Sequence, residues 1–243
     1  MNLVWAASGA VIGWVVGATL RGVVFRLSVP GGAPDQVDCP RCAAPLRPWP
    51  ASRCGYCGHT LGIPAALELA TATVLALLFG RFGGQPVTLA FGFLGALGVA
   101  LAAIDIGVQR LPDRLTLPAY PVLITLLAVA ALTGHDVSAL LRALLGGLAL
   151  AAGYLLLGIA RPGQLGGGDV KLAGLVGLVL GWLGWPALLS GTILGFLLAA
   201  VASLALLAAR RVTMRSAISF GPFLLGGALL AILASGQAGS HYP

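Results

Sequence analysis

The sequence predicts an all-α polytopic membrane protein with about eight transmembrane helices and one small cysteine-containing loop. Hydrophobic residues make up 58% of the 243 residues and charged residues only 9%, whereas a soluble domain averages roughly 25% charged residues. The mean hydropathy is +0.99. The apolar residues also fall into runs close to the length of about 20 residues that a spanning helix needs.

The apolar runs follow one another with short connections, except for one long polar segment after the first run. No basic region precedes the first run, which predicts a retained helix and not a cleaved signal peptide. The chain therefore divides into a first helix (1–25), a polar segment (26–63) and a membrane-embedded remainder (64–243). The eight predicted segments are 3–25, 64–80, 86–104, 116–134, 139–160, 170–183, 185–208 and 218–235.

Prolines and glycines support these segments. Glycine pairs inside them, Gly146-Gly147 and Gly226-Gly227, predict close helix packing, because small residues let helix backbones approach in a membrane. Prolines are expected at or near helix starts, where a missing N–H costs least. They are Pro64, Pro86, Pro118 and Pro186.

The basic residues predict the orientation, because cytoplasmic loops carry an excess of Lys and Arg. With the N-terminus outside, the inner loops hold eleven Lys and Arg residues and the outer loops only Arg81 and Arg142. The net charge of +7 then reflects orientation and anionic lipid headgroups. No basic helix face is interleaved with aromatic residues, so lipid is an expected partner and nucleic acid is not.

All four cysteines lie in the polar segment 26–63, which this orientation puts in the cytoplasm. They form two CxxC pairs, Cys39/Cys42 and Cys54/Cys57, with eleven residues between the pairs. Two such pairs match a zinc site of four thiolates. Two disulfides are the alternative, but cytoplasmic thiols stay reduced. We expect structural zinc, because four thiolates leave no open position and so small a segment needs a metal to fold.

Carboxylates are rare in this chain, and two of them stand at the ends of apolar segments. Only seven of the residues are acidic, and an ionisable group in an apolar segment marks a functional site by default. Asp105 ends one apolar run, and Asp169 follows three glycines and opens a helix predicted from Val170. Both lie at the cytoplasmic face, where two aspartates can share a proton and activate water against an amide.

Other polar residues have more than one interpretation. Asp113, in the loop after Leu111-Pro112, is either a neighbour of the catalytic pair or a solvated helix cap. Glu68 either pairs with Arg21 to hold two helices together or binds a positively charged substrate group. Histidines occur only in predicted loops and no HExxH motif is present, which argues against serine–histidine and zinc intramembrane proteases.

Four elements in this order resemble the type IV prepilin peptidases, the bacterial leader peptidases of the GxGD aspartic class. The resemblance runs nearly end to end. Its elements are the double CxxC segment, Ile104-Asp105 through Leu111-Pro112-Asp113 with Leu115-Thr116-Leu117-Pro118, the GxGD-x-K element Gly166-Gly167-Gly168-Asp169-Val170-Lys171, and Phe220-Gly221-Pro222.

The resemblance implies a bifunctional enzyme of the bacterial cytoplasmic (inner) membrane. It would cleave the basic leader of prepilins and pseudopilins after a glycine on the cytoplasmic side. It would then methylate the new N-terminal amine with S-adenosylmethionine, although no motif for methyl transfer can be placed in the sequence. By resemblance, Asp105 and Asp169 are the catalytic pair. The candidate supporting residues are Asp113, Lys171, Gly166, Gly168 and Glu68.

Two other functions remain open at this stage. One is a GxGD intramembrane protease of the presenilin or preflagellin type, which lacks methyl transfer. The other is a transporter that uses Asp105 and Asp169 as a proton or cation site. No inverted repeat is evident in the sequence, which counts against a transporter.

Overall fold

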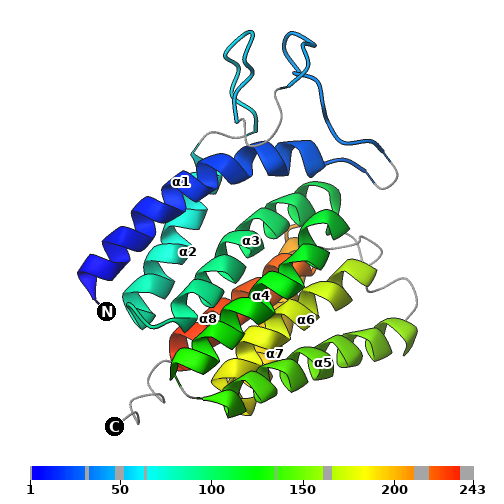
Figure 1. Cartoon of the computed structure of the whole chain (residues 1–243). Helices are drawn as coiled ribbons and strands as arrows, with labels where there is room; N and C mark the ends of the chain where they lie inside the picture. The colour runs from blue at the N-terminus through cyan, green and yellow to red at the C-terminus, as the bar shows by residue number, and fades with distance from the viewer. Residues whose placement is uncertain are drawn as a thin grey trace.

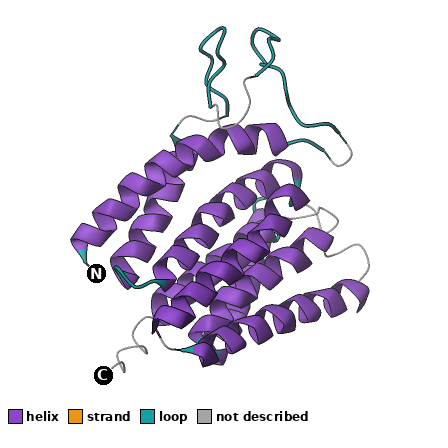
Figure 2. Cartoon of the chain, viewed as in Figure 1, coloured by secondary structure: helices purple, strands orange, loops and turns teal. Residues whose placement is uncertain are grey.

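The computed structural model describes residues 2–30, 33–46, 52–62, 65–134, 136–160, 166–210 and 219–235. Within these ranges the regular structure is helical (Figure 2). The helices are α1 (Leu3–Leu27), α2 (Ala66–Phe82), α3 (Val87–Val108), α4 (Asp113–Gly134), α5 (Val137–Ala160), α6 (Gly167–Leu183), α7 (Trp185–Ala208) and α8 (Gly221–Ser235).

These helices confirm the all-α membrane fold that the sequence predicts. Five of them, α1, α3, α4, α5 and α7, are long and apolar enough to cross a membrane. Helices α2 and α6 have 17 residues and α8 has 15, which is roughly 22–26 Å of helix against a hydrocarbon core of about 30 Å. The eight predicted segments are therefore all helical, while the number that cross the membrane stays a prediction.

Helix α6 lies at the centre of the bundle. Every residue from 172 to 181 is buried, and α6 packs against α3, α4, α5, α7 and α8. Its sequence is apolar on all sides, as expected for a helix with protein around its whole circumference. Helices α1 and α2 form a pair at one edge of the bundle, packed side by side (Figure 1).

Glycines set the closest helix contacts, as predicted for the two glycine pairs. A Cβ atom on Gly146 would lie 2.8 Å from the carbonyl oxygen of Gly177, where α5 meets α6. A Cβ atom on Gly227 would lie 2.6 Å from the carbonyl oxygen of Gly191, where α8 meets α7. Both distances are shorter than van der Waals contact. A larger residue at either position would force the two backbones apart.

Three helices begin earlier than the sequence suggested, and one of them, α5, begins at Val137 and not at residue 139. Helix α4 begins at Asp113, because the Pro112 carbonyl accepts backbone hydrogen bonds from Leu115 and Thr116. Pro118 therefore lies inside α4 and not near its start, so that expectation was wrong by about one turn. Helix α6 begins at Gly167 and not at Val170.

The cysteine-containing segment emerges from α1 at one end of the bundle (Figure 1). At this end α3 finishes and α4 begins. The connection between α3 and α4 contacts the segment, because the Arg110 guanidinium donates to the Pro30 carbonyl (3.4 Å) and Arg114 forms an ion pair with Asp35. The polar segment and the α3–α4 connection therefore share one face of the protein.

Candidate active site and cysteine cluster

Asp105 lies in the last turn of α3 and is held by the segment that opens α8. Its side chain is buried, with 5% of the residue exposed. The carboxylate oxygen Oδ2 accepts hydrogen bonds from the backbone N–H of Gly221 (3.1 Å) and from the hydroxyl of Ser219. These donors come from more than 110 residues later in the chain, so tertiary packing fixes this carboxylate.

Asp169 lies in the first turn of α6, half-buried, and accepts a hydrogen bond from the backbone N–H of Gly166 (3.2 Å). Its charge interacts with that of Asp105. Gly221 lies where α3, α6 and α8 meet. A Cβ atom there would be 2.6 Å from Asp105 Oδ2 and 3.4 Å from Leu172 of α6. The structure thus brings the two sequence-predicted aspartates to one end of three packed helices.

Asp113 and Lys171 form an ion pair across this end, with the Lys171 Nζ 2.6 Å from an oxygen of Asp113. The pair is partly exposed, so it contributes little to stability by itself. It ties the start of α4 to the start of α6. Nearby, a Cβ atom on Gly168 would lie 2.8 Å from the Leu111 side chain. The glycine therefore lets the α3–α4 connection pack directly on the element that carries Asp169.

Two carboxylates in partly desolvated surroundings cannot both ionise cheaply, and such a pair retains a proton. An ionised aspartate accepts a proton from water, and a protonated aspartate donates one to a carbonyl oxygen. Asp105 is the more buried of the two, with fixed donors, while Asp169 is half-buried. This arrangement is suited to acid–base hydrolysis of an amide.

Sequence reasoning assigned no role to three residues at this site. Ser219 and Gly221 hold Asp105, and the Phe220-Gly221-Pro222 element was the only signal for them. Tyr154 of α5 is 2% exposed, and its ring lies 5.8 Å from the ring of Phe220. No sequence pattern distinguishes this tyrosine from an ordinary residue of an apolar helix.

The four cysteines come together although they lie on two separate turns. Their sulfur atoms all lie within 4.8 Å of one another. Sulfurs from opposite CxxC pairs are the close neighbours, with Cys39–Cys57 and Cys42–Cys54 both at 3.7 Å and no disulfide among them. Tetrahedral zinc with Zn–S bonds of about 2.3 Å requires sulfurs roughly 3.8 Å apart. The cluster therefore fits a tetrahedral metal ion.

Each cysteine pair is shaped by backbone hydrogen bonds. The N–H of Cys39 donates to the Ala44 carbonyl and that of Cys54 to the His59 carbonyl, both at 2.9 Å. The backbone N–H groups of Cys57 and Tyr56 lower the pKa of the Cys54 thiol to about 6. Amides aimed at the sulfur stabilise the thiolate, which is the form that binds metals.

Glu68 forms an ion pair with Arg21 across the contact between α1 and α2, at 2.7 Å. The side chains of Arg21 and Glu68 are 8% and 5% exposed. The sequence left two interpretations of Glu68 open. The structure shows the first of them, an ion pair with Arg21 that joins two helices. A buried charge that lost its partner would be strongly destabilising, so each of these residues depends on the other.

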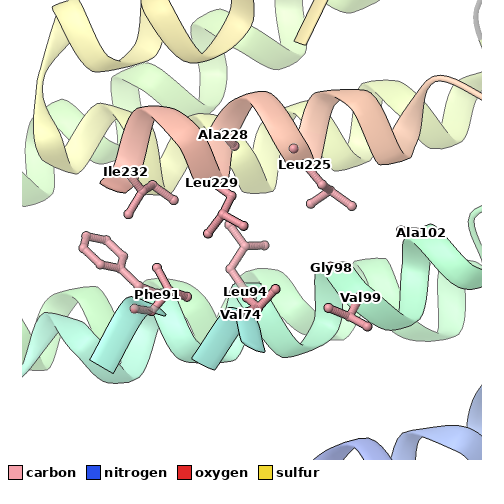
Figure 3. Close-up of a pocket in the computed structure, with 13 residues that line it drawn as sticks. Val74, Phe91, Leu94, Gly98, Val99, Ala102, Leu225, Ala228, Leu229 and Ile232 are labelled. Carbon is pink, nitrogen blue, oxygen red and sulfur yellow. The ribbon is translucent and has the colours of Figure 1, made fainter. Parts of the chain in front are cut away.

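Two hollows border the candidate active site. An apolar cavity of about 150 Å³ lies between α3 and α8, with Val74 of α2 also lining it (Figure 3). Ala102 and Leu225 line its walls, and they lie within about one helical turn of Asp105 and Gly221. A second, mixed polar and apolar crevice of about 630 Å³ lies between residues 27–29 and 33–37 on one side and residues 110–114 on the other.

Comparisons with known proteins agree with this geometry. The type IV leader peptidase family matches residues 92–208. The chain is 31% identical to a prepilin leader peptidase/N-methyltransferase of Burkholderia pseudomallei, over 91% of this chain and 82% of that relative. It is 30% identical to proteins of the same name from Pseudomonas aeruginosa (90% of this chain and 76% of the relative) and Bacillus subtilis (84% of each).

No solved structure matches the chain. The relatives nevertheless cover most of both chains. With its apolar helices, its two aspartates at one end of α3, α6 and α8, and these relatives, the chain belongs to the type IV leader peptidase family, the family of the prepilin leader peptidases/N-methyltransferases.

Proposed function

We propose that this protein cleaves the basic leader from type IV prepilins and pseudopilins after a glycine and then methylates the new N-terminal amine. The observation that carries the proposal is the meeting of Asp105 and Asp169 at one end of α3, α6 and α8. This makes the protein an aspartic endopeptidase and an S-adenosylmethionine-dependent N-methyltransferase of type IV pilus or type II secretion systems.

In the cleavage step, a water molecule between the two carboxylates adds to the scissile carbonyl carbon. One aspartate takes a proton from the water, and the other gives its proton to the carbonyl oxygen. The tetrahedral species then collapses: the aspartate that took the water proton gives it to the leaving amine, the C–N bond breaks, and the other aspartate takes back a proton from the diol as the carboxyl product forms. Gly166 orients Asp169, while the Asp113–Lys171 pair and Gly168 keep α4 and α6 in register beside it.

The proposed site faces the cytoplasm of the bacterial inner membrane, with the N-terminus of the chain outside. The basic residues Arg110, Arg114 and Lys171 support this orientation, because they gather at the end that carries Asp105 and Asp169. The first helix (1–25), the cysteine segment (26–63) and the remainder (64–243) are the proposed functional parts.

The apolar cavity between α3 and α8 suits side chains from the apolar segment of the substrate. We infer that this segment runs along the cavity between α3 and α8 (Figure 3), because α3 leads to Asp105 and α8 leads to Gly221, which donates to it. The distance along α3 from Phe91 to Ala102 is roughly 16 Å. A substrate helix laid against α3 would therefore run past the cavity over about eleven residues, place apolar side chains in it, and leave the scissile bond beside Asp105.

The crevice between residues 27–29 and 33–37 on one side and residues 110–114 on the other fits the methyl donor. Its volume of about 630 Å³ lies within the usual range of roughly 300–1,000 Å³ for small-molecule sites. Arg110 would bind the carboxylate of S-adenosylmethionine. Asp35 and Asp113, which keep their ion pairs with Arg114 and Lys171, would offer their remaining carboxylate oxygens to its ammonium group and ribose hydroxyls. When bound, S-adenosylmethionine supplies an electrophilic methyl group. Leu111 lines the crevice and also lies against Gly168, next to Asp169. The new N-terminal amine would therefore form close to the bound methyl donor.

Changing Arg110 to alanine is expected to lower the affinity for S-adenosylmethionine about tenfold or more, because a hydrogen bond to a charged group is lost. Equilibrium binding of the radiolabelled donor to purified protein measures this without any reaction. The ratio of methylated to unmethylated product should fall in parallel. Arg81→Ala, a change at the far end of α2, is the matched control. Equal binding by both variants would remove the crevice as the donor site.

The cysteine cluster is expected to hold one zinc ion per chain. Metal analysis of protein purified without chelator should find one equivalent of zinc, and Cys39→Ser should lose it, because three thiolates bind zinc far less tightly than four. Tyr56→Ala, which alters an exposed residue of the same turn without removing a sulfur, should keep the metal. Protein that contains no zinc, or a different metal at one equivalent, would contradict the assignment.

Mass spectrometry of a prepilin incubated with the purified enzyme and S-adenosylmethionine tests the proposed function. The expected product has lost its leader and gained one methyl group. Cleavage without methylation would favour a GxGD protease of the preflagellin or presenilin type. No cleavage, together with proton flux in vesicles that depends on Asp105, would favour the transporter.

A further inference from the structure

Tyr154 is a buried polar residue without an apparent structural purpose. Its hydroxyl is inaccessible to solvent and has no hydrogen-bond partner among the described residues. Leaving a buried hydroxyl unpaired is destabilising, and phenylalanine would fill the same space without that penalty. Buried tyrosine hydroxyls usually have a hydrogen-bond partner. The partner of this hydroxyl is therefore expected to be a group that is present only when substrate is bound.

The position of the ring indicates where that partner arrives. Tyr154 of α5 stacks on Phe196 of α7 (5.8 Å between ring centres) and contacts Phe220 (5.8 Å), and Phe196 and Phe220 are 5.1 Å apart. Phe220 stands between Ser219 and Gly221, the two residues that donate to Asp105. The three rings therefore brace the segment that holds one catalytic carboxylate.

The second carboxylate acts on Tyr154 through its charge and not through a hydrogen bond. The charge of Asp169 interacts with the Tyr154 hydroxyl, while the Asp169 hydrogen bond in the structure goes to the Gly166 amide. Tyr154 thus packs against the segment that holds Asp105, and its hydroxyl is bonded to neither proposed catalytic group. Ser219 and Gly221 already donate to Asp105. The acceptor for the Tyr154 hydroxyl is therefore expected to be a group of the substrate.

We propose that the Tyr154 hydroxyl donates a hydrogen bond to the oxygen of the scissile carbonyl, an inference that rests on the proposed cleavage function. As the water oxygen bonds to the carbonyl carbon, the C=O π electrons move onto this oxygen. The protonated aspartate supplies its proton there, and the ionised aspartate takes the proton from water. Tyr154 keeps its own proton and stabilises the developing negative charge, so the step balances without a further reactant.

A single change separates this role from a packing role. Tyr154→Phe keeps the ring and its contacts with Phe196 and Phe220 and removes only the hydroxyl. Loss of one donor to a developing oxyanion lowers kcat by about 10²–10³-fold, and KM is expected to stay within about threefold of the wild-type value because the bond strengthens only in the transition state. The melting temperature should stay the same or rise, since no hydrogen bond is lost and an unpaired hydroxyl is removed.

Tyr120→Phe is the matched control, because its hydroxyl already has a structural partner, the carbonyl of Lys171 at 2.7 Å. That variant should have a lower melting temperature and a kcat within about threefold of the wild type. Kinetics of prepilin cleavage and thermal unfolding, both with full-length enzyme in the same detergent, provide the readouts. A Tyr154→Phe variant with the kcat of the wild type would overturn the inference alone. A wild-type enzyme that cleaves no prepilin would overturn the proposed function, and this inference with it.

Discussion

Replacing Asp169 with asparagine is expected to reduce prepilin cleavage by about 10²–10⁴-fold, the contribution of a positioned acid or base. Asparagine has the same shape and its oxygen can still accept from the Gly166 amide (3.2 Å in the wild type). It can neither remove a proton from water nor carry one. Asp105→Asn should have an effect of the same order, because the buried carboxylate and its partner act as one unit.

Asp136→Asn is the control for both changes. Asp136 lies at the connection between α4 and α5, where its carboxylate accepts from the Ala139 N–H (2.9 Å) and caps α5. Asparagine caps helices equally well, so cleavage should not change. The measurement is the initial rate of leader removal, with circular dichroism of each variant to confirm the helical fold. Turnover within tenfold of the wild type by either catalytic variant would exclude that aspartate from the pair.

Changing Gly221 to alanine is expected to lower kcat by about 10²-fold, the cost of displacing a catalytic group by about 1 Å. The added methyl group would lie 2.6 Å from Asp105 Oδ2, closer than the two atoms can approach. The carboxylate must move, and it loses the geometry of its bonds to the Gly221 amide and the Ser219 hydroxyl. The neighbour on the other side, Leu172, is fully buried and leaves the methyl group no space.

The stability of this variant distinguishes displacement of Asp105 from general misfolding. Alanine favours a helix over glycine by roughly 1 kcal/mol, which offsets part of the crowding at the first residue of α8. Gly158→Ala is the control, since a Cβ atom on this α5 glycine meets no neighbour. A Gly221→Ala enzyme with wild-type kcat would show that the position of Asp105 is not set by the start of α8.

Much of this architecture could be predicted from the sequence because a membrane imposes simple local rules. A backbone in lipid must satisfy its own hydrogen bonds, so each long apolar run becomes a helix. All eight predicted segments are helical for this reason. The boundaries were less predictable, since the start of α4 depends on backbone hydrogen bonds to the Pro112 carbonyl that no composition reveals.

The candidate site could also be predicted from the sequence only in part. Asp105 and Asp169 could be selected from the sequence, because ionisable groups are too costly in apolar segments to be placed there without a use. The cysteines could be selected from their spacing. Neither argument could identify Ser219, Gly221 or Tyr154, whose residue types are ordinary in a membrane helix or a loop.

What the sequence alone determined is therefore the fold class, the two rare carboxylates and the four thiolates, since each follows from the cost or the spacing of residues along the chain. Only the tertiary structure decided how Asp105 is held, because its donors lie more than 110 residues away. It also decided that Glu68 pairs with Arg21 and that Tyr154 packs against Phe220 with an unpaired hydroxyl. Hydrogen bonds act over about 3 Å, so partners this far apart in sequence are selected by helix packing alone.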